Sequence, residues 1–340
     1  MNILFIGGTG TISMAISRRL LEQGHNLYLL NRGSSNKRLS AYQNCIEIIA
    51  DIHDEADVKE KLDGINFDAV CDFIAFVPEH LERDVRLFAK KTKQFIFISS
   101  ASAYQKPLSD YRVSEATPLA NPYWEYSRNK IACEDYLMQV YRETGFPVTI
   151  VRPSHTYDKR SVPLGVHGKN GSFQVVKRIM EEKPVIIHGD GTSLWTMTHQ
   201  SDFAEAFIGL VGNIHAIGEA VQITSDESLS WNQIYQTIAD TLGVTLKPYH
   251  VSSDFLDRCS EYNFRGSLTG DKANSVVFDN TKLKRLVPGF VAKKRFDQGI
   301  RETIFYVLSH PLLQKEDPDF DAWCDKVIST LDVAAEKIKG

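Results

Sequence analysis

A tyrosine and a lysine four residues apart form the pair with the clearest chemical potential in this sequence. Tyr126 and Lys130 open a stretch with helical character, and residues at this spacing lie on one face of a helix. The lysine ammonium can then lower the pKa of the tyrosine phenol, which would make Tyr126 an acid and base near neutral pH. We predict that this pair catalyses a proton transfer, although the same spacing arises by chance in many chains.

A serine-rich segment lies upstream, directly after an apolar run at 94–98. Ser100 and Ser102 belong to this segment, which ends at Tyr104. If the run is a strand, these hydroxyls follow its carboxyl end, where α/β sheets bind ligands. Serine-rich segments are usually only turns. The order of the two motifs along the chain is the stronger evidence, and it makes Ser100 a candidate catalytic residue and Ser102 a candidate substrate contact.

A glycine-rich loop near the amino terminus is the candidate nucleotide-binding element. It joins an apolar run at 2–6 to a helical pattern at 11–23, and Ser13 stands where a GxxGxxG motif has its third glycine. Gly7 and Gly10 allow a tight turn close to a pyrophosphate, and the following helix presents free N–H groups at its positive end. A purely structural turn is the alternative. The predicted contacts in this loop are Gly7, Thr9, Gly10, Thr11 and Ile12.

The segment after the second predicted strand bears on the choice of cofactor. It contains Asn31, Arg32 and Ser34, and no carboxylate stands there to hold the ribose hydroxyls. A cation and hydroxyls at this point favour a 2'-phosphate, so we predict NADP, with NAD as the alternative. A solvated polar loop is the structural explanation. Asp51 and Ile52 follow the third strand and could face the adenine, and the remaining predicted cofactor contacts are Ala75, Lys130 and Pro153.

The elements that position these residues follow an alternating pattern. Apolar runs that predict strands lie at 2–6, 26–30, 46–49, 68–74, 94–98 and 147–151, with helical patterns between most of them. This alternation predicts a parallel sheet with helices on both faces. After Pro153 we expect a helix near 172–182, a strand pair near 185–198, a helix near 201–212, a strand at 219–224 that re-enters the sheet and a helix at 230–242.

Composition narrows the class of protein. The chain has 340 residues, of which 43% are hydrophobic and 24% charged, with a net charge of -4. These values exclude disorder as the main state, and they provide no general attraction to nucleic acids or anionic membranes. The five cysteines form no CxxC pair, which suits a reducing compartment, and the ten histidines show no metal-binding spacing. Without an export signal or an apolar run of about 18 residues, we expect a cytoplasmic protein without a metal site.

Taken together, the motifs resemble those of the extended short-chain dehydrogenase/reductase family, in its NAD-dependent epimerase/dehydratase branch. The resembling segments cover nearly the whole chain and read GGTGTIS, SSASAY, YSRNK, VRPSHTY, GDGTSLWTMTHQSDFAEA and DNTKLKRLVPGF. The resemblance implies that Tyr126 donates and accepts the proton, that Lys130 binds the ribose and modulates the pKa of the tyrosine, and that Ser100 orients the reacting oxygen. It also implies a homodimer that pairs helices near 79–92 and 127–144.

The fold expected from this resemblance is a Rossmann-type doubly wound parallel sheet with a smaller C-terminal substrate-binding lobe. The dinucleotide-binding domain is expected at 1–160, with 200–226 re-entering its sheet, and the lobe at 161–199 and 227–340. His155 follows the strand that ends near Pro153, and His199 lies in the GDG segment. Both are candidate substrate contacts, although each is as readily explained as a partly buried side chain.

Two departures from the family pattern concern the reaction. Ala101 and Ser102 stand where sugar dehydratases of the family carry an Asp-Glu pair, which disfavours dehydration. Trp195 stands where the family has the arginine that holds the diphosphate of a nucleotide sugar, and an indole lacks that charge. Trp195 is therefore predicted to contact a substrate that is not a nucleotide sugar.

We accordingly predict an NAD(P)-dependent enzyme that transfers hydride at a carbinol carbon of a sugar or sugar-like small molecule, by net oxidation or reduction or by epimerisation. One alternative is a nucleotide-sugar epimerase in which Arg265 or Lys272 binds the phosphates. The other is a catalytically silent relative that binds RNA or senses redox state. The Ser100, Tyr126 and Lys130 set and the negative net charge argue against it, so neither nucleic acid nor membrane is an expected partner.

Overall fold

A parallel sheet forms the centre of the protein. The computed structural model describes residues 1–33 and 45–340, so the predicted cofactor contact Ser34 lies outside the described residues. The strands of the sheet are, in chain order, β1 (Asn2–Ile6), β2 (Asn26–Asn31), β3 (Ile46–Ile49), β4 (Ala69–Asp72), β5 (Phe95–Ile98), β7 (Val148–Pro153) and β12 (Ala220–Ile223). Their spatial order is β3-β2-β1-β4-β5-β7-β12, and every neighbouring pair is parallel. The predicted Rossmann-type doubly wound sheet is therefore confirmed, with its change of winding direction between β1 and β4.

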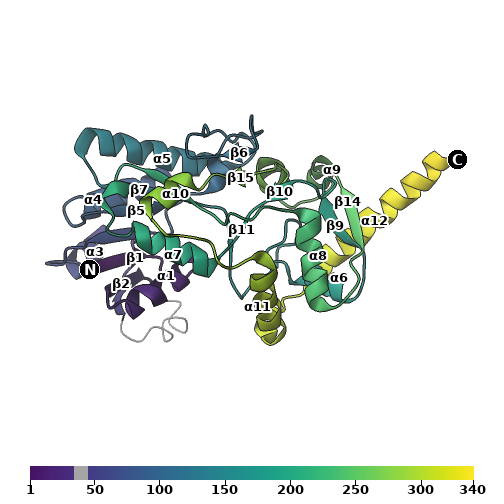
Figure 1. Ribbon diagram of the computed structural model, residues 1–340, viewed down its shortest axis with the longest axis horizontal. Coiled ribbons are helices and arrows are strands. Elements are labelled where there is room, and N and C mark those ends of the chain that lie inside the picture. Colours follow the sequence, from purple (N-terminus) through teal and green to yellow (C-terminus); the bar gives the residue numbers. More distant parts are fainter. Residues whose placement is uncertain (34–44) are drawn as a thin grey trace.

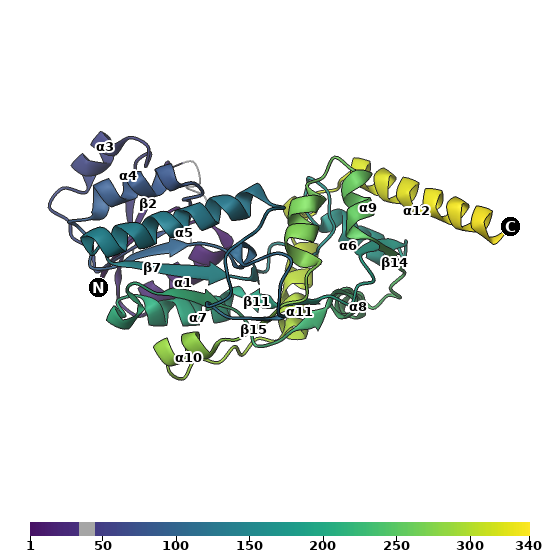
Figure 2. The same ribbon diagram turned by 90° about the horizontal axis from the view of Figure 1, so that it is seen from above.

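Helices cover both faces of this sheet (Figure 2). On one face lie α1 (Thr11–Glu22), α7 (Gln200–Leu210) and α10 (Thr281–Leu286), which contribute buried side chains such as Ile16 and Phe203. On the other lie α3 (Glu55–Lys61), α4 (Pro78–Phe88) and α5 (Glu125–Thr144), which contribute Leu81 and Leu137. Because both faces are covered, β4 and β5 are buried at every position, which is why their sequences read as continuous apolar runs.

Most of the chain beyond β7, apart from α7, β12 and α10, builds a lobe beside one end of the sheet (Figure 1). Its larger elements are α6 (Phe173–Met180), β9 (Val185–His188), α8 (Trp231–Leu242), β14 (Pro248–Val251), α9 (Ser253–Arg258), α11 (Phe296–Leu308) and α12 (Pro318–Lys339), together with a π-helix at Arg265–Lys272. The lobe has a hydrophobic core of its own, in which Trp231 and Tyr235 of α8 and Ile300 of α11 are buried. The carboxyl-terminal half of α12 projects away from the body of the protein (Figure 1).

The strand pair expected near 185–198 is wrong in its partners. β9 pairs in parallel with β14, which lies about sixty residues further along the chain. β10 (Leu194–Trp195) pairs with β13 (Leu229–Ser230), and β11 (Met197–His199) pairs with β8 (His155–Tyr157). A local pattern shows that a segment is extended, but the partner of each strand is set by packing across the whole lobe.

Short elements complete the fold. These are β6 (Arg112–Val113), β15 (Val277–Phe278) and 3-10 helices at Ala101–Ala103, Ile214–Ala216 and Pro311–Leu313. The lobe also reaches back to the amino-terminal part of the chain, since the Arg160 guanidinium donates a hydrogen bond to the Thr11 hydroxyl at the start of α1 (3.0 Å). Within the described ranges, no helix is long and apolar enough to cross a membrane.

Candidate active site

Lys130 connects α5 to the carboxyl ends of β4 and β5. It lies in the second turn of α5, is buried, and donates hydrogen bonds to the carbonyl oxygens of Ala75 after β4 and Ile98 at the end of β5, both at 2.7 Å. Its ammonium also lies 4.7 Å from the ring centroids of Phe76 and Phe97. Lys130 therefore fixes the start of α5, and with it Tyr126, against the carboxyl ends of the strands.

The pKa values of the pair differ from the expectation based on spacing alone. Burial raises the pKa of Tyr126, and a hydrogen bond with Ser100 only partly offsets this effect. Burial also lowers the pKa of Lys130 to about 8. The Lys130 ammonium is bound to two carbonyl groups and lies 5.8 Å from the tyrosine ring centroid. The predicted lowering of the Tyr126 pKa by Lys130 is therefore wrong for this structure, because desolvation of the phenol dominates.

A chain of hydroxyl groups connects Ser100 to α5. The Oγ atoms of Ser100 and Ser102 are 2.9 Å apart, and the Ser127 hydroxyl donates to Ser102 Oγ at 2.8 Å. Ser100 Oγ also accepts a hydrogen bond from the Ser102 amide, which caps the 3-10 helix that follows β5. Asn121 holds this helix from outside, since its side-chain amide donates to the Ser102 carbonyl at 2.8 Å. The hydroxyl of Ser100 thus has a defined position beside Tyr126.

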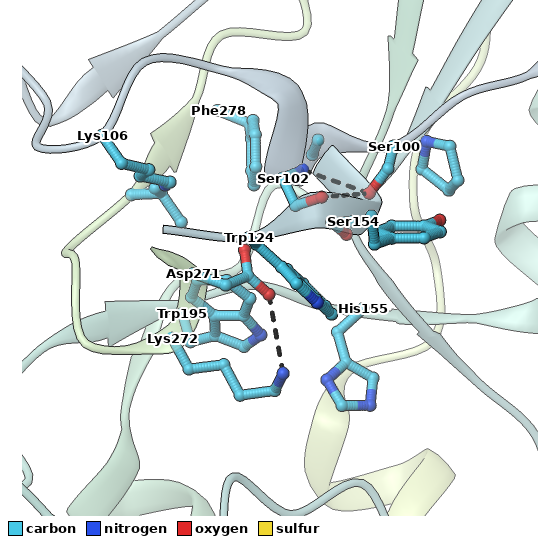
Figure 3. Close-up of a pocket in the computed structure, with 14 residues that line it drawn as sticks. Ser100, Ser102, Lys106, Trp124, Ser154, His155, Trp195, Asp271, Lys272 and Phe278 are labelled. Carbon is cyan, nitrogen blue, oxygen red and sulfur yellow. Dashed lines mark hydrogen bonds and ion pairs between the residues drawn. The ribbon is translucent and has the colours of Figure 1, made fainter. Parts of the chain in front are cut away.

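Ser100 and Tyr126 line one cavity of about 250 Å³ between the sheet and the lobe (Figure 3). The predicted substrate contacts Ser102, His155 and Trp195 line it as well. Pro153, predicted to contact the cofactor, also lies on this cavity. Ala101, which stands where the resembling dehydratases carry an acidic residue, lines it too, and the lining residues that sequence reasoning did not single out are Lys106, Trp124, Ser154, Asp271, Val276 and Phe278.

The charged cavity residues that the sequence analysis did not identify come from segments far apart in the sequence. Lys106 follows the 3-10 helix after β5, and Asp271 belongs to the π-helix of the lobe. Asp271 forms an ion pair with Lys272 at 3.5 Å. Lys272, named above as an alternative phosphate ligand, lines the cavity, and its ammonium lies 6.0 Å from the ring centroid of Trp195. The other alternative, Arg265, is exposed and is not among the lining residues.

The structure does not bring His199 to this cavity. Its ring caps the amino terminus of α7, where Nδ1 accepts a hydrogen bond from the Ser201 amide at 3.3 Å. The ring also packs edge-on against Tyr157, with centroids 5.3 Å apart. A histidine that follows a short strand and precedes a helix can satisfy the first free N–H groups of that helix. This structural role accounts for His199.

A larger cleft of about 620 Å³ lies at the carboxyl ends of β1 to β5, where the winding direction of the sheet changes. The predicted cofactor contacts that line it are Gly7, Thr9, Gly10, Thr11, Ile12, Asn31, Arg32, Asp51 and Ile52. Ala75 is buried beside it and bonds to Lys130, and both of its chain neighbours line the cleft. His53, Phe73 and Leu30 are lining residues that sequence reasoning missed.

The glycine loop fits a dinucleotide. Gly7 has a φ of 81°, and a Cβ atom there would collide with the side chain of Ile74. The loop therefore requires glycine at this position. Ser13 at the third motif position is buried and accepts a hydrogen bond from the Gly10 amide at 2.9 Å, which stabilises the loop. Asn31 Nδ2 is a buried donor without a partner among the described residues. An unpaired donor at this edge of the cleft suits the oxygen atoms of a nucleotide.

Comparisons with known proteins identify several sequences that are similar to this chain. The chain is 23% identical over 294 residues to the 2'-dehydrokanamycin reductase of Streptomyces kanamyceticus, across 85% of this chain and 80% of that protein. It is 28% identical over 217 residues to the uncharacterised UDP-glucose epimerase YtcB of Bacillus subtilis (strain 168), across 63% of this chain and 60% of that protein. It is also 26% identical over 252 residues to the chloroplast stem-loop binding protein of 41 kDa b of Arabidopsis thaliana, across 71% of this chain and 63% of that protein.

Among solved structures, the UDP-glucuronic acid 4-epimerase of Bacillus cereus, in complex with UDP-glucuronic acid and NAD, has the same fold. Its TM-score is 0.72 at 18% identity, over 91% of this chain and 99% of that one. The sequence model of the NAD-dependent epimerase/dehydratase family matches residues 3–223. This match includes the glycine loop, the serine segment and the Tyr126 to Lys130 motif. Since it spans well over half of the chain, the protein is a member of the NAD-dependent epimerase/dehydratase family.

Proposed function

We propose that the protein is an NAD(P)-dependent oxidoreductase or epimerase that acts at a carbinol carbon of a sugar or sugar-like substrate. The observation that carries this proposal is the position of Ser100 and Tyr126 on one cavity, beside the cleft that holds the glycine loop. A bound nicotinamide dinucleotide would accept or supply the hydride. The Tyr126 phenol moves the proton of the substrate hydroxyl, and the Ser100 hydroxyl holds the reacting oxygen.

Lys130 supports this chemistry by its position behind Tyr126. An ammonium group has three N–H donors, and the carbonyl groups of Ala75 and Ile98 accept two of them. The third is available to a ligand. Because Ile98 lines the nucleotide cleft and Ala75 lies between two residues that line it, the third donor suits a ribose hydroxyl of the cofactor. Lys130 would then bind the cofactor and hold Tyr126 in place through α5.

The substrate proposed is an unactivated sugar or polyol. The cavity of about 250 Å³ is below the roughly 300–1,000 Å³ of sites for drug-sized ligands, which supports a monosaccharide over a nucleotide sugar. Trp195 lines the cavity with its flat ring, stacked on Trp231 with centroids 6.0 Å apart. Such a wall suits the C–H face of a sugar ring, and it replaces the arginine with which relatives of the family bind a diphosphate.

The preference for NADP is a further part of the proposal. The end of β2 carries Asn31 and the exposed Arg32, both on the nucleotide cleft. A guanidinium at this point supports a 2'-phosphate, because charge-assisted hydrogen bonds to phosphate are strong.

A cytoplasmic location and a homodimer complete the proposal. Cys71, Cys133 and Cys324 are buried free thiols, which supports a reducing compartment. The homodimer would pair α4 and α5, which lie side by side on one face of the protein (Figure 1). Glu82 of α4 and Asp135 of α5 are exposed on these helices, so this interface would contain polar contacts between the two copies.

A tyrosine variant tests the catalytic part of the proposal. Tyr126→Phe keeps the ring and removes the proton carrier, so turnover should fall at least about a hundredfold while cofactor binding is retained. Turnover is measured as reduced cofactor formed from a panel of free sugars, sugar acids and polyols with NADP and NAD. The control is Tyr111→Phe, because Tyr111 is 59% exposed and lies outside the cavity. Near wild-type turnover in Tyr126→Phe would reject the mechanism.

A nucleotide-sugar epimerase is the second candidate function. The observation in its favour is Lys272, a cation on the cavity beside Trp195 that could contact a phosphate. Its Asp271 neighbour already pairs with it, which reduces the charge available for a diphosphate. RNA binding is disfavoured by the net charge of -4, since affinity for nucleic acid depends mainly on cationic contacts to phosphate.

A further inference from the structure

The catalytic cavity contains an unusual charge balance. The charged groups among its lining residues are Lys106, Lys272 and Asp271, and the lining also contains His155. Burial, together with the nearby Lys272 and His167, lowers the pKa of His155 to about 3, so its ring is neutral at physiological pH. Two ammonium groups therefore face one carboxylate. The cavity has one positive charge in excess.

Lys106 is the source of this excess. Its residue is only 4% exposed, and its ammonium makes no hydrogen bond or ion pair within the part of the chain that the structure describes. The ammonium is not among the polar atoms that are sealed from solvent without a partner, and Lys106 lines the cavity. Asp271 is the one charged group that raises its pKa against the effect of burial, and the carboxylate of Asp271 is in contact with Lys272 at 3.5 Å. An ammonium at the end of a largely buried side chain, with no partner in the protein, is costly unless water or a ligand in the cavity binds it. Such exceptions to the rules of burial are concentrated at functional sites.

The lysines and the reacting groups lie in different parts of the cavity. In Figure 3, Lys106 lies at the upper left and Ser100 at the upper right, with Ser102 between them, and Asp271 and Lys272 lie below Ser102. A substrate that spans this distance would place one end near the two lysines and a carbinol carbon near Ser100. Trp195, close to the Lys272 ammonium, would cover the ring of the substrate.

We propose that the substrate carries one carboxylate, which binds to Lys106 and Lys272 while the carbinol carbon lies at Ser100 and Tyr126. The substrate class is then a sugar acid or a related hydroxy acid. This inference rests on the proposed function, because it places the anion in the same cavity as the reacting groups. A single carboxylate matches one excess positive charge, whereas a phosphate monoester carries about 1.5 to 2 negative charges at neutral pH.

The test is a calorimetric titration of the NADP-loaded protein with glucuronate, galacturonate, glucose and a hexose phosphate. The sugar acids are expected to bind at least about tenfold more tightly than glucose, in the range of charge-assisted hydrogen bonds. Lys106→Met should remove this advantage, so that sugar acids and glucose bind this variant with similar affinity. The matched control is Lys169→Met, because Lys169 is exposed and lies outside the cavity. It should bind sugar acids as the wild type does.

Thermal melting of the ligand-free protein separates a ligand-binding role of Lys106 from a structural one. Removal of an ammonium that has no hydrogen bond or ion pair in the described structure should leave the melting temperature of Lys106→Met equal to or above that of the wild type. A lower melting temperature would show that Lys106 supports the fold and would overturn the proposal. Lys272→Met provides an independent binding comparison at the second lysine, with loss of the sugar-acid advantage as the expected result.

The outcomes distinguish this inference from the proposed function. Equal affinity for sugar acids and glucose would overturn the carboxylate site, even if neutral sugars are turned over and the proposed function holds. Tighter binding of the hexose phosphate than of both sugar acids would also overturn it. Sugar-acid binding that depends on Lys106, without any turnover, would support the carboxylate site while the proposed function fails.

Discussion

A buried ion pair connects the elements that carry the proposed catalytic residues, and its removal should destabilise the protein strongly. Glu134 lies on α5 one turn after Lys130, and Arg152 lies on β7. Arg152 Nη2 donates to Glu134 Oε2 at 2.6 Å and Arg152 Nε donates to Oε1 at 3.0 Å, in a pair whose side chains are 5% and 3% exposed. The Ser99 hydroxyl, next to Ser100, also donates to Glu134. The variant Glu134→Ala would leave the Arg152 guanidinium buried and unpaired.

The size of the effect follows from the burial of the pair. Loss of one partner of a buried ion pair costs about 3–5 kcal/mol. An unfolding entropy of about 2.1 cal/mol/K per residue gives about 0.7 kcal/mol/K for a chain of 340 residues. The melting temperature of Glu134→Ala should therefore fall by about 4–7 °C. The start of α5 should also lose its fixed position, so turnover should fall together with stability.

Scanning calorimetry at neutral pH measures this shift, with two further variants as controls. Asp135→Ala removes a neighbouring exposed carboxylate from the same helix and should change the melting temperature by less than about 1 °C, as is usual for surface positions. The double variant Glu134→Leu with Arg152→Met replaces both charges by apolar groups and should recover most of the loss. A decrease below about 1 °C in Glu134→Ala, or a double variant less stable than the single one, would refute the role assigned to the pair.

Three further predictions concern the cofactor, the substrate and assembly. NADP should bind more tightly than NAD by about 1–3 kcal/mol in calorimetry, and Arg32→Ala should remove this difference; equal affinities in the wild type would contradict the role of Arg32. UDP, GDP and TDP sugars should bind weakly or not at all to the cofactor-loaded protein, because Trp195 provides no charge for a diphosphate; micromolar affinity for any of them would favour the nucleotide-sugar epimerase. Light scattering at micromolar concentration should give the mass of a dimer, and a mass near the 38.4 kDa of one chain would exclude it.

The sequence by itself determined the architecture of the sheet and the position of the proposed catalytic motif. Apolar runs such as 95–98 are local signals, and their alternation with helical patterns was enough to predict a parallel doubly wound sheet. The spacing of Tyr126 and Lys130 placed both residues on α5, because helix geometry depends on neighbouring residues only. The glycine loop was recognisable for the same reason: Gly7 requires a positive φ and lies between a strand and a helix.

Only the tertiary structure decided how the surrounding residues are used. His199 belongs to a motif segment, yet its ring caps α7 because the neighbouring N–H groups of that helix need an acceptor. The pKa of Tyr126 is raised because burial outweighs its hydrogen bond with Ser100, and burial results from packing between the sheet and the lobe. Lys106 and Asp271 are separated by more than 160 residues in sequence and share one cavity. No local sequence pattern predicts that these two residues lie on one cavity, because their proximity depends on how both parts of the chain fold together.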